Sequence, residues 1–282
     1  MCLLLASERW SWITGSNGEL QKKLAMKSSI GRLQQLLNIK NASFARASHG
    51  ANPNNVFTKP IASFVIHSPP SSPHFWAVTG PMKTDLLKVA AGQYIPHPPR
   101  SRVYPLLSDT FQYQQIQFLN FTDASGLDKV HLLARYESFS YKGVLEMSDD
   151  VNSVRNYITG ANNYNSNLDS VKRLDENYIG QLMKLFNLEL LQNKWINSLS
   201  NGQMRRARIA KALVNKPNVL LVDDPFLGLD PDATEMVSRS LHDVASQFGI
   251  AVVLGLRVQD QVPEWVQNVA YVDPEGIAKQ GT

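Results

Sequence analysis

The second half of the chain alternates between helical patterns and short apolar runs, and this alternation constrains the fold more than any other feature. Residues 218–224 and 250–256 are short and rich in Val and Leu, which is typical of strands buried on both faces. Residues 203–215 and 232–248 have helical patterns, and each comes directly before one of these runs. This order predicts βαβ units, a mostly parallel sheet and an α/β fold.

The first half of the chain carries the remaining strand and helix signals. Short apolar segments bounded by turn-rich sequence are further strand candidates, at 36–44, 62–67 and 75–80. A helix is expected over 83–91, ending before Gly92. The prolines of 95–107 exclude a helix interior there. At the other end of the chain, residues 270–281 predict a hairpin that turns at 274–276.

The middle of the chain reads as mostly helical over residues 151–198, with a polar, Asn-rich interruption at 161–167. Within this range, residues 178–191 carry an apolar stripe at helical spacing. Such a stripe favours packing in the core over a surface for a partner, so we expect it to be buried.

Composition sets the broad class of the protein. The chain has 282 residues, 43% of them hydrophobic and 18% charged, which suits a globular protein with a sizeable core. The single cysteine, Cys2, excludes a disulfide framework or zinc cluster within one chain and favours an intracellular, reducing compartment. No stretch approaches 18 consecutive apolar residues, so we expect no transmembrane segment.

The positive charge of the protein is concentrated at its N-terminus. Residues 1–50 hold seven basic and two acidic side chains. Their excess of five positive charges is larger than the net charge of +4 for the whole chain. The near-neutral remainder argues against a basic face for nucleic acid, and no DNA partner is expected. Residues 1–34 form a basic, flexible segment with two interpretations: an organelle-targeting peptide, with a mitochondrial location, or a plain tail on a cytoplasmic protein.

Three short strings follow one another in the second half of the chain: Leu199-Ser200-Asn201-Gly202-Gln203, the strand ending in Asp223, and Gly228-Leu229-Asp230. Together they resemble the signature, Walker B and D-loop motifs of the ATP-binding cassette (ABC) ATPase family. The family's signature reads LSGGQ, so Asn201 is the one departure. The resemblance covers about residues 35–281 and implies one P-loop NTPase cassette over 35–282. It also implies a small antiparallel β part and a helical subdomain at about 110–200.

Each string also has a physical reading of its own. Ser200, Asn201 and Gly202 come before a helix, where free N–H groups and the positive end of the helix dipole favour an anion. The structural alternative is a capping box between Ser200 and Gln203. In the family these residues bind nucleotide, and Asp230 would be the D-loop residue.

Carboxylates at the end of a buried strand point to metal and acid–base chemistry. Asp223 suits a Mg²⁺ site. The family places a glutamate next, as general base, and here that residue is Asp224, whose shorter reach implies slower hydrolysis. In the family a histidine follows the next strand and contacts the γ-phosphate. Here Arg257 stands in its place, so Arg257 and Asp224 are the catalytic candidates; the alternative for Arg257 is a solvated strand-end charge. The family's glutamine loop would lie near 118–126, where the sequence has no glutamine.

Residues 76–92, WAVTGPMKTDLLKVAAG, resemble a shortened P-loop. Only two residues separate Gly80 from Lys83, where the motif G-x-x-x-x-G-K-[ST] has five, and Met82 stands at the second glycine. The register of the family implies that Lys83 meets phosphate and Thr84 meets Mg²⁺. With the arc of glycine N–H groups missing, we predict a degenerate site and no efficient hydrolysis by the isolated chain.

The family works in head-to-tail pairs, in which each ATP lies between one cassette's P-loop and the other's signature loop. A good signature beside a poor P-loop resembles the degenerate half of such a pair. The resemblance therefore implies ATP and Mg²⁺ as cofactors and, as partner, a second cassette in the same full-length chain or in another subunit. The alternative is a non-catalytic regulatory or assembly module that keeps the fold. A transporter's energy subunit would need a separate membrane protein.

Overall fold

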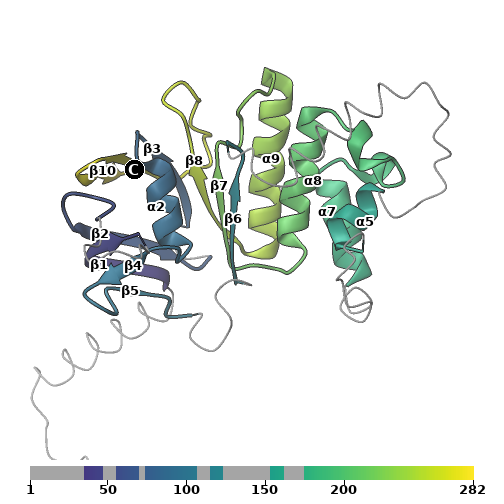
Figure 1. Ribbon diagram of the computed structural model, residues 1–282. Helices are drawn as coiled ribbons and strands as arrows, with labels where there is room; N and C mark the ends of the chain where they lie inside the picture. Colours follow the sequence, from purple (N-terminus) through teal and green to yellow (C-terminus); the bar gives the residue numbers. More distant parts are fainter. Residues whose placement is uncertain (1–34, 47–54, 70–73, 107–114, 123–152, 162–174) are drawn as a thin grey trace, which may run out of the picture.

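The computed structural model describes residues 35–46, 55–69, 74–106, 115–122, 153–161 and 175–282 (Figure 1). The N-terminal segment 1–34 and the interruption expected at 161–167, apart from residue 161, lie outside these ranges. No helix in the described ranges is long and apolar enough to cross a membrane.

A six-stranded sheet forms the centre of the molecule, in the order β10-β9-β3-β8-β7-β6. Its strands are β3 (Phe75–Thr79), β6 (Ile116–Asn120), β7 (Val219–Asp223), β8 (Ala251–Gly255), β9 (Asn268–Asp273) and β10 (Gly276–Gly281). Every pairing is parallel except that of β9 with β10, which form the predicted C-terminal hairpin. The mostly parallel sheet expected from the sequence is confirmed.

A second, antiparallel sheet lies on one side of the first (Figure 1). Its long strand β1 (Gln35–Ala45) pairs with β2 (Ile61–His67), β4 (Ile95–His97) and β5 (Arg102–Val103). The proline-rich stretch therefore contributes two short edge strands, and the predicted small antiparallel part is present.

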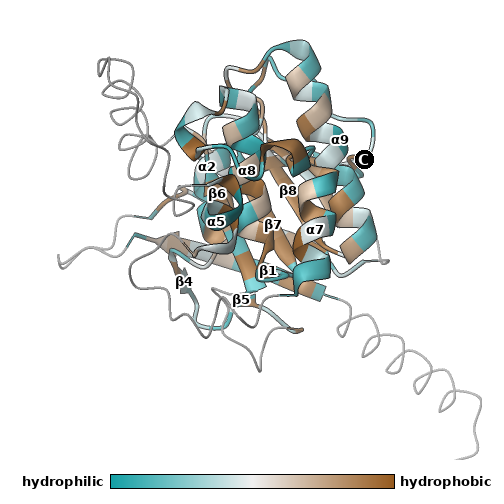
Figure 2. Cartoon of the chain, turned by 90° about the vertical axis from the view of Figure 1, so that its right-hand side faces the viewer, coloured by the Kyte–Doolittle hydropathy of each residue, from teal (hydrophilic) through white to brown (hydrophobic). Residues whose placement is uncertain are grey.

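Helices cover both faces of the central sheet. The antiparallel sheet and α2 (Lys83–Ala90) lie on one face. The other face carries α8 (Asn201–Leu213) and α9 (Pro231–Phe248), with α5 (Val154–Thr159), α7 (Glu176–Leu185) and the 3-10 turns η2 (Glu189–Leu191) and η3 (Ile196–Ser198) beyond them. Figure 2 shows that the strands β7 and β8 are hydrophobic, and Figure 1 shows them between these layers.

Alternation along the strands explains the two cores. In β3, Phe75 and Ala77 belong to the core beneath α8 and α9, whereas Trp76 and Val78 belong to the core beneath α2 and the antiparallel sheet. In β7 the residues divide in the same way. Since successive side chains of a strand point to opposite faces, a strand covered on both sides must be apolar throughout, as the sequence pattern indicated.

The longest helix has clear start and stop signals. The Asp230 side chain accepts a hydrogen bond of 2.7 Å from the Ala233 N–H, proline occupies the first turn, and Gly249 ends α9 with a φ of 66°. These caps fix where α9 begins, immediately after the expected D-loop.

The middle of the chain differs from the expectation in two places. The expected helical stripe 178–191 is α-helical only to Leu185, because Asn187 takes a φ of 50° and breaks the helix before the 3-10 turn η2. Its apolar residues are buried or partly buried, as expected, except Leu190, which is exposed. Strand β6 falls inside the range 110–200 predicted as a helical subdomain, but it is part of the central sheet. The domain boundaries themselves stay a prediction.

Candidate functional site

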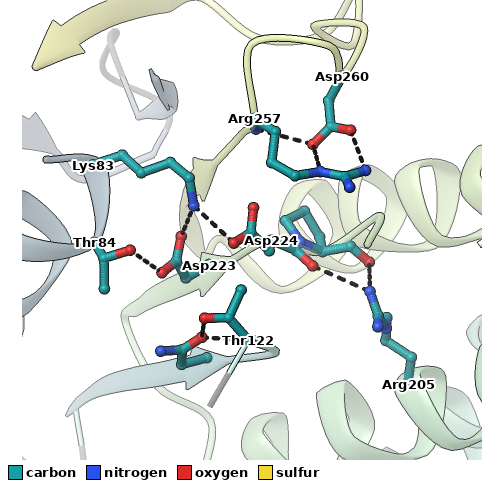
Figure 3. A network of polar contacts seen from close by, with 10 residues as sticks. Lys83, Thr84, Thr122, Arg205, Asp223, Asp224, Arg257 and Asp260 are labelled. Atoms are coloured by element: carbon teal, nitrogen blue, oxygen red, sulfur yellow. Dashed lines mark hydrogen bonds and ion pairs between the residues drawn. The ribbon is translucent and has the colours of Figure 1, made fainter. Parts of the chain in front are cut away.

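The predicted P-loop and Walker B residues meet at the carboxyl edge of the central sheet, where β7 ends and α2 begins (Figure 3). Lys83 Nζ lies 2.5 Å from Asp223 Oδ1 and 2.9 Å from Asp224 Oδ2. The Thr84 hydroxyl donates a 2.5 Å hydrogen bond to the other oxygen of Asp223. Asp223 is fully buried, and the Lys83 side chain is 11% exposed. One ammonium group therefore neutralises part of a pair of buried carboxylates.

The turn between β3 and α2 is three residues long and folds back on the chain. Gly80 has a φ of 107°, and a Cβ at this position would lie 2.2 Å from the Val272 carbonyl oxygen of β9. The Met82 N–H donates to that same Val272 carbonyl at 3.3 Å, and the Lys83 N–H donates to the Gly80 carbonyl at 3.3 Å. Two backbone donors that a phosphate-binding loop would direct at its ligand are thus used inside the chain.

Asp224 occupies a strained position at the end of the strand. Its φ is 54°, a conformation that costs a non-glycine residue about 1–2 kcal/mol. Its N–H donates to the Gly255 carbonyl at 2.9 Å, and its Oδ1 is buried without a hydrogen-bond partner within the described part of the chain. Burial raises the pKa of the Asp224 carboxyl above its ordinary value, although Lys83 opposes this shift.

Arg257, which the sequence placed in the catalytic set, is held by a neighbour that the sequence analysis overlooked. Its guanidinium group makes two contacts with Asp260, at 3.1 Å from Nε to Oδ2 and at 2.7 Å from Nη2 to Oδ1 (Figure 3). The Arg257 N–H also donates to Asp260. This pairing raises the pKa of Arg257 and closes the turn after β8. A catalytic role for Arg257 remains a prediction.

The signature residues form a second group with the D-loop. Ser200, Asn201, Gly202 and Gln203 line a depression of about 450 Å³ together with Asp230 and its neighbours. None of Lys83, Thr84, Asp223, Asp224 and Arg257 lines this depression. The structure therefore gathers the candidate residues into two separate sites.

Ser200 forms the capping box that was the structural alternative. Its hydroxyl accepts from the Gln203 N–H at 3.3 Å, and the Gln203 side-chain oxygen accepts from the Ser200 N–H at 3.0 Å. Helix α8 begins at Asn201, two residues earlier than expected, so Asn201 and Gly202 belong to its first turn. A Cβ on Gly202 would lie 3.4 Å from the Ala233 side chain, so the start of α8 lies within van der Waals range of α9.

The residues at the sheet edge suit a hard cation in type. Thr84 and Asp223 offer adjacent hydroxyl and carboxylate oxygens, the ligand types that Mg²⁺ prefers alongside water and phosphate. In the described part of the chain, no cluster of three or more His, Cys, Asp or Glu side chains is arranged to hold a metal ion.

Three further residues beside the site were missed by sequence reasoning. Asn120 ends β6 directly opposite Asp223 in the sheet, and its side-chain oxygen accepts a 2.6 Å hydrogen bond from the Thr122 hydroxyl (Figure 3). Arg205 of α8 donates to the carbonyl oxygens of Asp224 and Pro225. The run of basic residues in α8 was visible in the sequence, but nothing local indicated that Arg205 points to the Walker B turn.

Comparison with known proteins agrees with this geometry. Residues 83–227 match the family model described as ABC transporter. The chain is 33% identical over 261 residues to an uncharacterized ABC transporter ATP-binding protein of Saccharomyces cerevisiae, covering 87% of this chain and 45% of the relative. A second such protein, from Schizosaccharomyces pombe, is 31% identical over 212 residues, covering 73% and 41%. The chain thus spans less than half the length of these relatives.

Solved structures share the fold at low sequence identity. The cbiO1 protein of Clostridium perfringens, part of the ABC transporter complex cbiONQ, aligns with a TM-score of 0.60 at 18% identity, covering 88% of each chain. A bacterial Atm1-family ABC exporter with ATP bound aligns with a TM-score of 0.58 at 13% identity, covering 93% of this chain and 44% of the exporter. With the matched family model and the motifs in their expected places, the chain belongs to the ABC transporter family and has the fold of its ATP-binding cassettes.

Proposed function

We propose that this cassette supports ATP binding and hydrolysis at a site shared with a second ABC cassette, to which it contributes its signature loop and D-loop. One observation carries the proposal: the Ser200–Gln203 turn and Asp230 border a common open depression of about 450 Å³. The first turn of α8, with its dipole and N–H groups, faces this side of the molecule. A triphosphate held by another chain would find its anion-binding contacts here.

The state of the chain's own P-loop supports a role in trans. Lys83 is already paired with Asp223 and Asp224, and two N–H groups of the turn are bonded within the chain. A nucleotide at this site would have to replace these contacts and would lack the arc of loop donors. We therefore propose that the P-loop is degenerate and that the isolated chain hydrolyses ATP slowly.

The test measures Mg²⁺-ATP hydrolysis by the chain alone and after addition of candidate cassette partners. We expect the right partner to stimulate hydrolysis. We expect Ser200→Arg to abolish this stimulation, because the long, positively charged arginine side chain would fill the depression. Ser198→Arg is the matched control, since Ser198 is exposed two residues earlier and lies outside the depression. Absence of stimulation by any cassette, or equal loss in both variants, would refute a shared site.

A second function, a non-catalytic regulatory or assembly module, is favoured by the same closed cluster at the sheet edge. Lys83 and Thr84 both donate hydrogen bonds to Asp223, so side chains of the chain itself compensate the charge of this carboxylate. Calorimetry with ATP, with and without Mg²⁺, separates the two proposals. Binding that is absent even in the presence of an intact partner cassette supports the module.

A further inference from the structure

Helix α8 connects the two candidate sites within a single helical turn and a half. At its N-terminus, Ser200 and Gln203 form the capping box of the signature loop. Five residues after Ser200, the Arg205 Nη1 donates to the carbonyl oxygens of Asp224 at 3.1 Å and Pro225 at 2.8 Å (Figure 3). The same short stretch of helix therefore carries one site and holds the backbone of the other.

Aromatic stacking reinforces this connection. The guanidinium group of Arg205 lies 4.5 Å from the centre of the Phe121 ring, and that of Arg208 lies at the same distance. The Phe121 N–H donates to the Asp223 carbonyl at 3.1 Å. A guanidinium group over the face of an aromatic ring is attracted by the ring electrons. Through Phe121, the two arginine side chains thus hold α8 against the carboxyl ends of both β6 and β7.

The turn that Arg205 holds is the strained one. Asp224 has a positive φ, and its carbonyl accepts from both Arg205 and the Leu227 N–H, at 3.1 and 3.3 Å. A left-handed non-glycine residue persists only where its surroundings fix it. The guanidinium group of Arg205 is the side chain that donates a hydrogen bond to the Asp224 carbonyl oxygen in the described part of the chain. The position of the Asp224 carboxylate thus depends on the placement of α8.

We propose that Arg205 is a positioning residue that couples the signature loop to the Asp224 turn, so that a change at Ser200 is transmitted to the carboxylate site of the same chain. A ligand that shifts the first turn of α8 would move Arg205 and release or tighten the turn. The two nucleotide sites of a cassette pair would then be linked through one helix. The use of this coupling in ATP turnover rests on the proposed function, but the coupling itself is a property of the chain alone.

The first experiment measures amide hydrogen exchange by NMR at Asp224 and Leu227 in the isolated chain. Arg205→Met should raise exchange at both amides about tenfold or more, since a hydrogen bond from a charged donor is lost. Arg205→Lys should restore most of the protection, because an ammonium group can still donate to the carbonyl oxygens. Arg208→Met is the matched control: it removes an arginine that lies over the same Phe121 ring and donates to the Asn120 carbonyl of β6.

The second experiment tests transmission from the signature loop. Ser200→Ala removes the cap and should raise exchange at Leu227 severalfold in the wild-type background, but not in the Arg205→Met background. An equal effect in both backgrounds, or equal effects of Arg205→Met and Arg208→Met, overturns the coupling. Thermal unfolding of each variant separates local opening from global loss of stability. Because these measurements need no nucleotide or partner, they can succeed where the shared-site ATPase test fails, and the reverse.

Discussion

Replacing Lys83 with methionine tests the charge cluster at the sheet edge directly. The substitution removes the ammonium group that contacts Asp223 and Asp224 but keeps the length and apolar stem of the side chain. Asp223 is fully buried and Asp224 is 5% exposed, so neither carboxylate gains compensating hydration. Removing one partner from a buried ion pair costs about 3–5 kcal/mol. For a chain of this size, that corresponds to a fall in Tm of roughly 10 °C.

Urea denaturation at neutral pH, followed by circular dichroism, measures the free energy of unfolding of Lys83→Met against wild type. Lys88→Met, on the same helix, is the control and should change stability by less than about 1 kcal/mol. The double variant Lys83→Met with Asp223→Asn should recover much of the loss, because it removes one unpaired buried charge. A loss below about 1 kcal/mol for Lys83→Met alone would refute the inward pairing of this lysine.

Two further predictions concern the same sheet edge, and a third concerns helix α7. Gly255→Ala should destabilise the protein by about 1–3 kcal/mol in a thermal melt, since a Cβ there would lie 2.4 Å from Asp223 Oδ1 and 2.8 Å from the Leu87 side chain. Gly180 lies in an exposed helical position, where a Cβ would meet nothing within 4 Å. Gly180→Ala should therefore stabilise the protein by about 0.5–1 kcal/mol in the same assay. Asp224→Asn should raise the free energy of unfolding at pH 7, because a folded-state pKa above the ordinary value of 3.8 weakens folding as pH rises. That gain should vanish below about pH 3.8 in urea titrations, and a gain independent of pH would contradict the assignment.

The sheet elements were predictable because their signals are local. Strands β7 and β8 are short runs rich in Val and Leu, and because both faces are buried they show no alternation of apolar and polar residues. The caps Asp230 and Gly249 determine where α9 begins and ends. The strand-end position of Asp223 followed directly, since the carboxyl ends of parallel strands share one edge. Lys83 and Thr84 were placed by the register of their helix, and the structure brings both to Asp223.

What the sequence could not supply depends on contacts between distant residues. Nothing in the local sequence indicates that Met82 and Gly80 pack on Val272, or that Arg205 reaches the carbonyl oxygens of the Asp224 turn. The break at Asn187 was missed because the apolar residues beyond it continue the sequence pattern, although only part of them is buried: Leu188 is in the core and Leu190 is exposed. The apolar pattern alone does not show where a helix ends or which apolar residue points to solvent.

The inward pairing of Lys83 sets a condition on what can enter the sheet edge. A polyphosphate that binds Lys83 by itself leaves Asp223 and Asp224 without the ammonium group that they contact. A divalent cation by itself displaces this ammonium group from both carboxylates with which it pairs in the described part of the chain. Either ligand alone therefore leaves a buried charge without a partner. When both bind together, the phosphate pairs with Lys83 and the cation pairs with the two carboxylates. The charges at this edge of the sheet therefore favour a metal-complexed nucleotide over free metal or free nucleotide as a ligand.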